Sequence, residues 1–480
     1  MMKRVLLPSG LLLAPALFSL SAEAQTRQPN VIFILADDLG YGDLGCYGQQ
    51  LILTPRLDAM SRAGMLFTDF YAGCSVSAPS RASLMTGLHT GRTRIRGNKE
   101  VQPEGQTPMA DRATLGRLFQ QAGYRTGIFG KWGLGHPGSG AEPADRGFDR
   151  FYGYNCQRVS HKYYPEHLWS DRERVLFEEN AGDARKTYAP SLIQEQALRF
   201  IDESAQEGKP FFAMLTYTLP HAELNLPHDE SYAYYRGKLT PKPWQGGPSG
   251  YGSTPDAHAS FAAMVTLLDS YVGQVVDRIK ELGLEEDTLI IFTSDNGPHR
   301  EGGADPEYFD GNGPLRGHKR DLYEGGIRVP MIAYWPGRIT PESRCSVPGA
   351  FWDFMPTFAS MLGEKQPETS GVDLMPLLLG QAKARARKQE RPLYWEFHEE
   401  GGKMALRQGK WKLVALKVNS DAPVYELYNL EQDLGEQNNL AEQEPRRLER
   451  MKRQMQRMHS PSELFPFKHE RVAQQPLGMP

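Results

Sequence analysis

Asn30-Val31-Ile32-Phe33-Ile34-Leu35-Ala36, followed directly by Asp37-Asp38, is a short and nearly continuous apolar run that ends in two acidic residues. A run of this length without polar alternation is typical of a strand buried on both faces of a sheet. Residues 211–217 and 288–293 have the same character, and residues 126–129 are a weaker example. Together these runs predict a parallel-rich sheet.

Helical patterns lie between the predicted strands. Apolar residues recur at three-to-four spacing over residues 113–122, 189–207 and 259–282. Pro190 suits the first turn of the second helix, and Gly208 suits its end. Strands that alternate with helices favour an α/β fold in which helices cover both faces of the sheet.

The sequence from about Arg391 onward has a different character. Short strand-like pieces separated by Gly, Asn or Asp are typical of an antiparallel meander; they span residues 393–397, 403–407, 411–416 and 425–429. Residues 444–458 then have the pattern of a charged amphipathic helix. We therefore predict a catalytic domain over 25–375, a smaller C-terminal subdomain over 376–470 with an antiparallel sheet plus a helix, and a tail over 471–480.

The N-terminus predicts export. Lys3 and Arg4 precede an apolar run over residues 5–20, and Ala22-Glu23-Ala24 gives a small-x-small cleavage pattern. This arrangement is typical of a signal peptide, here residues 1–24. A transmembrane anchor is the alternative, but the run is short and is interrupted by proline and glycine. We expect a periplasmic or extracellular protein with no stable membrane insertion.

Charge and cysteine content narrow the function classes further. The chain has 55 Lys and Arg against 58 Asp and Glu, a net charge of −3, so no basic excess points to nucleic acid. The four cysteines show no CxxC or zinc-like spacing; they are Cys46, Cys74, Cys156 and Cys345. Four cysteines allow three full pairings, among which sequence cannot choose. We expect mostly buried free thiols.

Polar residues follow the predicted strands at the points where they end; these residues are Asp37, Asp38, Lys131, His221, Asp295 and Asn296. In open α/β sheets, ligands bind at the carboxyl ends of the strands. The three carboxylates and one amide are hard oxygen donors that suit Ca²⁺ or Mg²⁺. Each acidic pair alone is also compatible with a turn or a helix cap.

The segment Ser77-Ala78-Pro79-Ser80-Arg81-Ala82-Ser83-Leu84-Met85-Thr86-Gly87 is the most specific feature of the chain. Pro79 suits the first turn of a helix and Gly87 suits its end. Ser77 would then lie just ahead of a helix N-terminus, which favours an anion. Arg81 adds a fixed positive fork. A capped surface helix is the alternative for the segment by itself.

This segment closely resembles the signature of the type I sulfatases of the alkaline phosphatase superfamily, in which Cys or Ser, x, Pro, a small residue and Arg are followed by Thr-Gly. Further motifs occur in the family's order from about residue 29 to about residue 460: Asp37-Asp38, Gly130-Lys131-Trp132, Pro220-His221, Ser294-Asp295-Asn296-Gly297, and Lys319 through Glu324-Gly325-Gly326. The resemblance implies an alkaline-phosphatase-like mixed sheet between helices and an exported bacterial glycan sulfatase or arylsulfatase.

The resemblance also implies that Ser77 is oxidised to formylglycine. Cys74 lacks a proline two positions on and should not be modified. A serine-type signature implies a radical S-adenosylmethionine enzyme as maturation partner, acting before export. The hydrated aldehyde offers two hydroxyls: one attacks sulfur, and after the alcohol leaves the other loses its proton and expels sulfate.

By the same resemblance, calcium is bound by Asp37, Asp38, Asp295, Asn296 and the hydrated residue 77, with Mg²⁺ as the alternative ion. Arg81 and Lys131 stabilise residue 77, while Lys319 and His221 contact the sulfate and the leaving oxygen, and one of these two, with His221 preferred over Lys319, supplies the leaving-group proton. The chain departs from the family pattern at Gly133, where many relatives carry a histidine that helps to hold the formylglycine. His136 is the candidate replacement unless the role is lost.

Substrate specificity is weakly encoded. The polar and aromatic candidates for contacting a sugar are Asn155, Cys156, Gln157, Arg158, His161, Lys162, Tyr163, Tyr164, His167, His299, Arg300, Glu301 and Asp305. Similarity to exported bacterial glycan sulfatases favours a carbohydrate sulfate on a galactose- or N-acetylgalactosamine-type sugar. The alternatives are a phosphatase or phosphonate monoester hydrolase of the superfamily, a non-catalytic sulfated-glycan binder, and a structural protein.

Overall fold

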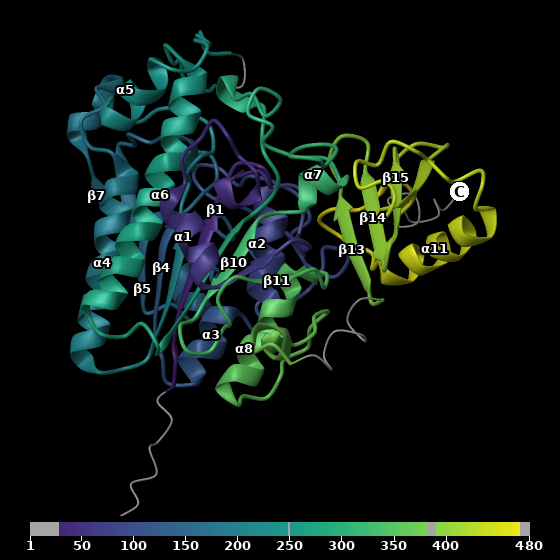
Figure 1. Cartoon of the computed structure of the whole chain (residues 1–480), viewed down its shortest axis with the longest axis horizontal. Helices are drawn as coiled ribbons and strands as arrows, with labels where there is room; N and C mark the ends of the chain where they lie inside the picture. Colours follow the sequence, from purple (N-terminus) through teal and green to yellow (C-terminus); the bar gives the residue numbers. More distant parts are fainter. Residues whose placement is uncertain (1–27, 248–249, 382–389, 471–480) are drawn as a thin grey trace, which may run out of the picture.

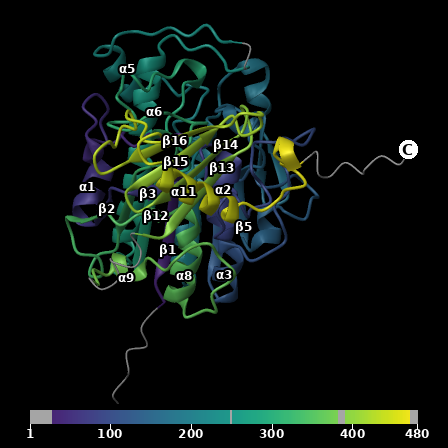
Figure 2. The ribbon, with the colours of Figure 1, turned by 90° about the vertical axis from the view of Figure 1, so that its right-hand side faces the viewer.

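A computed structural model describes residues 28–247, 250–381 and 390–470. The predicted signal peptide and the predicted tail lie outside these ranges. Within them, the chain forms a 10-stranded sheet with helices on both faces and, beside it, a 4-stranded sheet (Figures 1 and 2). This arrangement confirms the predicted α/β class with a smaller antiparallel C-terminal sheet.

The strand order of the large sheet places its earliest strand near the centre. From one edge to the other the strands are β11 (Ser343–Cys345), β2 (Met65–Phe67), β10 (Met331–Tyr334), β9 (Thr288–Ser294), β1 (Asn30–Ala36), β8 (Phe211–Thr216), β4 (Arg125–Lys131), β5 (Arg150–Tyr154), β6 (His167–Ser170) and β7 (Glu173–Leu176). The central strands from β9 to β5 are parallel. Their carboxyl ends therefore meet at one edge.

Every residue of β1 is buried, because helices cover both faces of the sheet. Ile32 and Ile34 belong to one core cluster, and Val31 and Phe33 belong to the cluster on the opposite face. One face is covered by α1 (Pro55–Ala63), α4 (Ala189–Glu207), α5 (Glu230–Arg236) and α6 (Ala257–Glu281). The other is covered by α2 (Ser77–Thr86), α3 (Leu115–Gln121), α8 (Phe354–Leu362) and α9 (Met375–Leu378).

The predicted elements are observed with small shifts in their ends. The weak run at 126–129 extends to Arg125–Lys131, because its last residues pair with β5 on one side and β8 on the other. Among the described residues, α6 is long and apolar enough to cross a membrane, yet 72% of its apolar window is buried inside the protein. Burial of that kind is typical of a core helix.

Shorter elements connect the main ones. A small sheet pairs β3 (Phe70–Tyr71) with β12 (Gly349–Ala350), and α7 (Glu324–Ile327) precedes β10. Turns of 3₁₀ helix span η1 (Gly45–Tyr47), η2 (Pro143–Arg146), η3 (Val159–His161), η4 (Glu178–Asp183), η5 (Glu301–Gly303) and η6 (Phe351–Asp353).

The C-terminal sheet is the predicted meander, consisting of β13 (Pro392–Phe397), β14 (Lys403–Gln408), β15 (Trp411–Leu416) and β16 (Val424–Asn429). Helix α11 (Pro445–Met458) lies over this sheet (Figure 2), and its buried residues Met451 and Met455 belong to the same core cluster as the strands. Cys74 and Cys156 are buried free thiols, Cys46 is a partly exposed one, and Cys345 is buried. The cysteines thus agree with the expectation of mostly buried thiols.

Candidate active site

The carboxyl edge of the central strands brings together the polar residues that follow them. β1 pairs with β9 so that Ala36 lies opposite Ser294, and this register sets Asp37 level with Asp295. Asp38 has a left-handed backbone (φ 63°), and its N–H donates to Asp295 Oδ1 at 3.1 Å. The acidic residues of two strands far apart in sequence therefore form one cluster, as the sequence predicted.

Ser77 is the first residue of α2, at the helix end that attracts anions. Its hydroxyl donates to Asp37 Oδ1 at 3.1 Å. Lys131, the last residue of β4, has its Nζ 3.3 Å from Ser77 Oγ and 2.7 Å from Asp37 Oδ2. The side chain of Ser77 is only 1% exposed. The helix ends at Gly87, whose φ of 71° is the left-handed conformation that glycine favours.

Arg81 lies one turn further along α2 and points to the same cluster. Its Nε is 3.0 Å and its Nη2 is 2.9 Å from Asp295 Oδ2, and its Nη1 donates to the Lys131 carbonyl at 3.1 Å. A guanidinium held at three points is pre-organised, so little rotamer freedom remains to be lost when an anion binds.

Lys319 approaches from the loop before α7. Its ammonium donates to Asp38 Oδ2 at 2.8 Å, to Glu301 Oε2 at 2.8 Å, and to His221 Nε2 at 2.9 Å. The His221 ring lies between the rings of His161 and His299, at centroid distances of 4.6 and 5.5 Å.

The Lys319–His221 pair has its proton on the lysine. Burial alone would lower the pKa of Lys319, but Asp38 and Glu301 outweigh burial and raise it. Burial, together with Lys319, lowers the pKa of His221 to about 4. At neutral pH the imidazole is therefore neutral and accepts a hydrogen bond through Nε2, while its Nδ1 faces the carbonyl of Ala222.

The acidic cluster fits a hard divalent cation. Burial, with Asp37 close by, raises the pKa of Asp295 to about 7 even though Arg81 lies against the same carboxylate. Asn296 donates through Nδ2 to Asp38 Oδ1 at 2.6 Å, but its Oδ1 is buried with no partner. An unpaired amide oxygen beside carboxylates is the donor set that Ca²⁺ or Mg²⁺ prefers.

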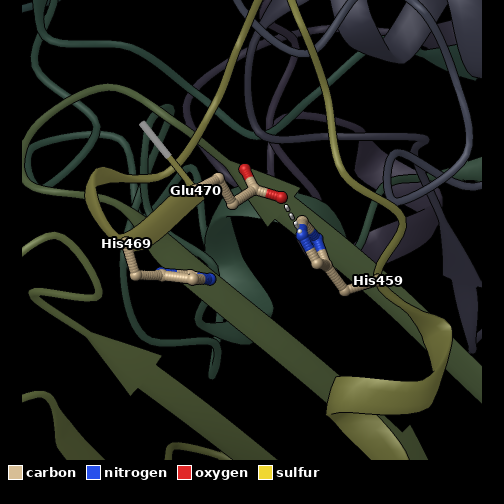
Figure 3. Close-up of side chains that lie close together, drawn as sticks. All are labelled: His459, His469 and Glu470. Atoms are coloured by element: carbon tan, nitrogen blue, oxygen red, sulfur yellow. Dashed lines mark hydrogen bonds and ion pairs between the residues drawn. The ribbon is translucent and has the colours of Figure 1, made fainter. Parts of the chain in front are cut away.

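A second group of potential metal ligands lies at the end of the described chain, formed by His459, His469 and Glu470 (Figure 3). There His459 Nε2 is 2.7 Å from Glu470 Oε1, and its Nδ1 is 2.6 Å from Glu396 Oε1. Both ring nitrogens are thus engaged by carboxylates, and the arrangement is that of a closed ion pair.

The remaining predicted site residue, His136, bonds within its own loop. Its Nδ1 is 3.2 Å from the carbonyl of Pro137, and its backbone N–H donates to Ser139 Oγ at 3.1 Å. The hydrogen bonds of His136 therefore do not join it to Ser77.

Two residues that sequence reasoning did not single out also belong to the site. Tyr251, in a stretch rich in Gly, Pro and Ser, donates to Glu301 Oε2 at 3.1 Å. Asn98 accepts from the N–H of Ala78 at 2.9 Å and so caps the helix that starts at Ser77. Tyr251 could not be predicted because its surroundings have the composition of a surface loop. Asn98 could not be predicted because no local sequence pattern marks it.

The fold and this site define an α/β hydrolytic enzyme of the alkaline-phosphatase type, with a buried serine at a helix N-terminus, an acidic cation cluster and paired cationic side chains. The chain belongs to the sulfatase family: the family model "Sulfatase" matches residues 29–383, and the model "N-sulphoglucosamine sulphohydrolase, C-terminal" matches residues 317–461. It is accordingly a sulfuric ester hydrolase.

Individual relatives agree with this assignment. Human arylsulfatase A is 33% identical over 475 residues, covering 90% of this chain and 86% of that protein. Mouse N-acetylgalactosamine-6-sulfatase is 31% identical over 426 residues, covering 84% and 75%. Among solved structures, Ps i-CgsB in complex with k-i-k-neocarrahexaose superposes with a TM-score of 0.78 at 27% identity, covering 93% of this chain and 96% of that one.

Proposed function

We propose that this protein is an exported sulfatase that hydrolyses an O-sulfate of a carbohydrate, using Ca²⁺ and a formylglycine formed from Ser77. The observation that carries the proposal is the position of Ser77 Oγ, which lies 3.1 Å from Asp37 and 3.3 Å from Lys131 at the N-terminus of α2. Such a position presents residue 77 to a cation on one side and to an anionic ester on the other.

Ser77 rather than a cysteine is the residue proposed for oxidation. Cys74 is buried and its thiol contacts the Glu396 carbonyl. Burial raises the pKa of Cys74 to about 12, which leaves it protonated and unreactive. The proposed maturation partner is a radical S-adenosylmethionine enzyme. The aldehyde hydrate would supply two hydroxyls on one carbon, which an unmodified serine lacks.

Asp37, Asp38, Asp295 and Asn296 would hold the cation together with residue 77. A divalent ion there supplies Lewis-acid stabilisation of negative charge. Asp37 also accepts the hydrogen bond of the residue 77 hydroxyl, which orients that oxygen. Arg81 and Lys131 place positive charge beside the same oxygen, and Mg²⁺ remains the alternative ion.

Lys319 and His221 are proposed to serve the leaving group as a pair. The lysine ammonium lies 2.9 Å from His221 Nε2 and donates a hydrogen bond to the neutral imidazole. We expected one of the two, with His221 preferred, to supply the proton; because the imidazole is neutral, Lys319 holds that proton before the reaction. A positioned acid of this kind contributes about 10²–10⁴ in rate.

The substrate class is proposed as a sulfated sugar of the galactose or N-acetylgalactosamine type. Relatives that are named for an N-acetylgalactosamine sulfate, and a solved relative in complex with a neocarrahexaose, support a sugar substrate. The N-terminal pattern of residues 1–24 supports export.

Mass spectrometry of the Ser77 peptide combined with turnover assays tests the proposal. Oxidation removes two hydrogens from residue 77, and the oxidised protein should hydrolyse an aryl sulfate and a panel of sulfated monosaccharides. Faster turnover of an aryl phosphate would favour the phosphatase or phosphonate hydrolase alternative. An unmodified Ser77 in protein produced with the maturation enzyme, with binding but no turnover, would favour a glycan binder, and absence of tight calcium would favour a structural protein.

A further inference from the structure

Gly133 lies two residues beyond Lys131 and has no side chain. The Gln157 side chain occupies the space that a side chain at residue 133 would need. A Cβ added at Gly133 would lie 2.4 Å from Gln157 Nε2, and the Gly133 backbone has a φ of 69°. A histidine at this position, as the family pattern has it, would collide with Gln157. The Gln157 amide therefore lies where a side chain of residue 133 would begin.

Gln157 lies among other buried amides that lack hydrogen-bond partners. Gln157 Nε2, Gln106 Nε2 and Asn155 Oδ1 are buried and unpartnered, in side chains that are 4%, 0% and 2% exposed. Gln106 Oε1 lies 3.5 Å from the Gln157 backbone nitrogen, and the Gly133 N–H donates to the Asn155 carbonyl at 3.0 Å. We call these three side chains the amide pocket. Buried polar groups normally have partners, so these three amides have hydrogen-bonding capacity that a ligand could use.

The amide pocket borders the catalytic residues. Lys131 pairs with Tyr154 at the carboxyl ends of β4 and β5, and Asn155 follows directly. On the other side, Ser160 donates to the Gln157 carbonyl at 2.6 Å, and the turn continues to His161, whose ring stacks on His221 at 4.6 Å. The pocket thus lies between the lysine beside Ser77 and the histidine beside the proposed acid.

We propose that the amide pocket binds a hydroxyl group of the sulfated sugar next to the sulfate ester. The pocket offers donors from Gln106 and Gln157 and an acceptor from Asn155, and a hydroxyl both accepts and donates, whereas a sulfate oxygen can only accept. The three side chains are neutral, which suits an uncharged part of the substrate. This inference rests on the proposed function, because it names a substrate contact of the same site.

The amide pocket gives Gly133 a role of its own. A histidine there would fill the pocket and exclude the hydroxyl, so glycine makes the hydroxyl contact available. Departure from the family pattern at this position thus selects a substrate rather than merely removing a contact to residue 77.

The first test compares Gln157→Ala with wild type on a sulfated monosaccharide and on an aryl sulfate that has no sugar hydroxyls. Loss of one neutral hydrogen bond should lower the sugar-to-aryl ratio of kcat/KM roughly 10-fold. Gln120→Ala is the matched control, because Gln120 bonds Asp149 at the opposite end of β5 and should leave the ratio unchanged. Formylglycine occupancy is measured for each protein, so a maturation defect is not read as a binding defect.

An unchanged ratio in Gln157→Ala would overturn the inference, because a purely structural glutamine would affect both substrates alike. A wild-type protein that is oxidised at Ser77 and yet hydrolyses no sulfate ester would instead overturn the proposed function, so the two failures are distinguishable.

A second test uses the close approach of Gly133 to Gln157 in a double-mutant cycle. Gly133→His alone should lower both the Tm and the sugar-to-aryl ratio, because its Cβ meets Gln157. Combining it with Gln157→Ala should restore part of the Tm but not the ratio, because the left-handed backbone of residue 133 still disfavours a side chain. Additive effects on the Tm would show that the two positions do not compete for one space, and would contradict the inference.

Discussion

The molecule contains two buried ionic clusters that look alike in composition but differ in completeness. At the edge of the large sheet, Asp295 has a pKa raised to about 7 and Asn296 Oδ1 has no partner. In the C-terminal region, the buried Glu396 accepts from Arg96, Tyr394, His398 and His459 through both its oxygens. The first cluster has a buried hydrogen-bond acceptor without a donor, whereas in the second cluster both oxygens of Glu396 accept hydrogen bonds.

The two clusters show how a binding site can be distinguished from a structural ion cluster. A buried carboxylate that is fully paired adds no capacity for a ligand, whereas an unpaired amide oxygen among three carboxylates suits a cation. If this distinction is correct, the first cluster governs catalysis and the second governs stability.

The largest expected effect on activity comes from substitution of residue 77, which lies in the first cluster. Ser77→Ala removes the group to be oxidised and should reduce turnover of an aryl sulfate by roughly 10⁴-fold or more. Ser191→Ala is the control and should keep full activity. Ser191 is an exposed serine of α4 whose hydroxyl shares a hydrogen bond with Tyr271. Circular dichroism checks that both variants are folded. Undiminished desulfation by Ser77→Ala would end the proposed mechanism.

A cation ligand should combine a large loss of activity with a small change in stability. Asp295→Asn should lower kcat about 10³-fold and release the bound ion, since a metal supplies several kcal/mol of charge stabilisation. Because burial raises the pKa of Asp295 to about 7, its ionised form is disfavoured in the absence of a cation. The free energy of unfolding measured with chelator should therefore change by no more than about 1 kcal/mol.

The reverse pattern is expected at the closed cluster. Glu396→Gln leaves Arg96 and His459 without their carboxylate and should lower the free energy of unfolding by about 3 kcal/mol, as for a broken buried pair. Activity per folded molecule should stay within about twofold, because this residue lies outside the proposed site. Glu449→Gln, which breaks only an exposed bond to Lys452, is the matched control. Loss of activity without loss of stability would break the comparison.

The smallest expected effect is the pH dependence of that stability. His459 has a pKa raised from 6.5: burial would lower it, but the carboxylates of Glu396 and Glu470 outweigh burial. Its contribution is therefore fully present below pH 6.5 and is lost as pH rises through the raised value. Glu396 has a pKa lowered from 4.5, because its histidine and arginine partners outweigh burial. Its contribution is present above pH 4.5 and is lost as pH falls.

Urea unfolding across pH should thus show the greatest contribution of the cluster between pH 4.5 and 6.5. Glu396→Gln should flatten this profile. An identical profile in the variant and the wild type would show that these groups do not titrate as a linked pair.

Long, wholly buried strands were predictable from the sequence, because burial on both faces removes polar alternation. β1, β8 and β9 are examples, and their register brought the predicted acidic residues together. The short strands β2, β10 and β11 went unnoticed, because three or four residues show no distinctive period. Their pairing comes from tertiary packing.

The site divides in the same way. Asp37, Lys131 and Asp295 follow strands directly, so their meeting could be predicted from a parallel sheet. Lys319 depended on the family motif, because a loop carries it to Asp38. Glu301 was expected to contact a sugar, yet it also bonds Lys319 at 2.8 Å. Such contacts between loops have no local sequence signal.

The burial of Ser77 bears on the order in which oxidation and folding occur. Ser77 is 1% exposed, and it is the first residue of a helix that is buried throughout. A second protein therefore has no access to Ser77 once folding is complete. If Ser77 is oxidised as proposed, we expect oxidation to precede folding, and a molecule that folds first to keep its serine. The active fraction of a preparation is then set by the relative rates of oxidation and folding. Later addition of the maturation enzyme to folded protein should restore no activity.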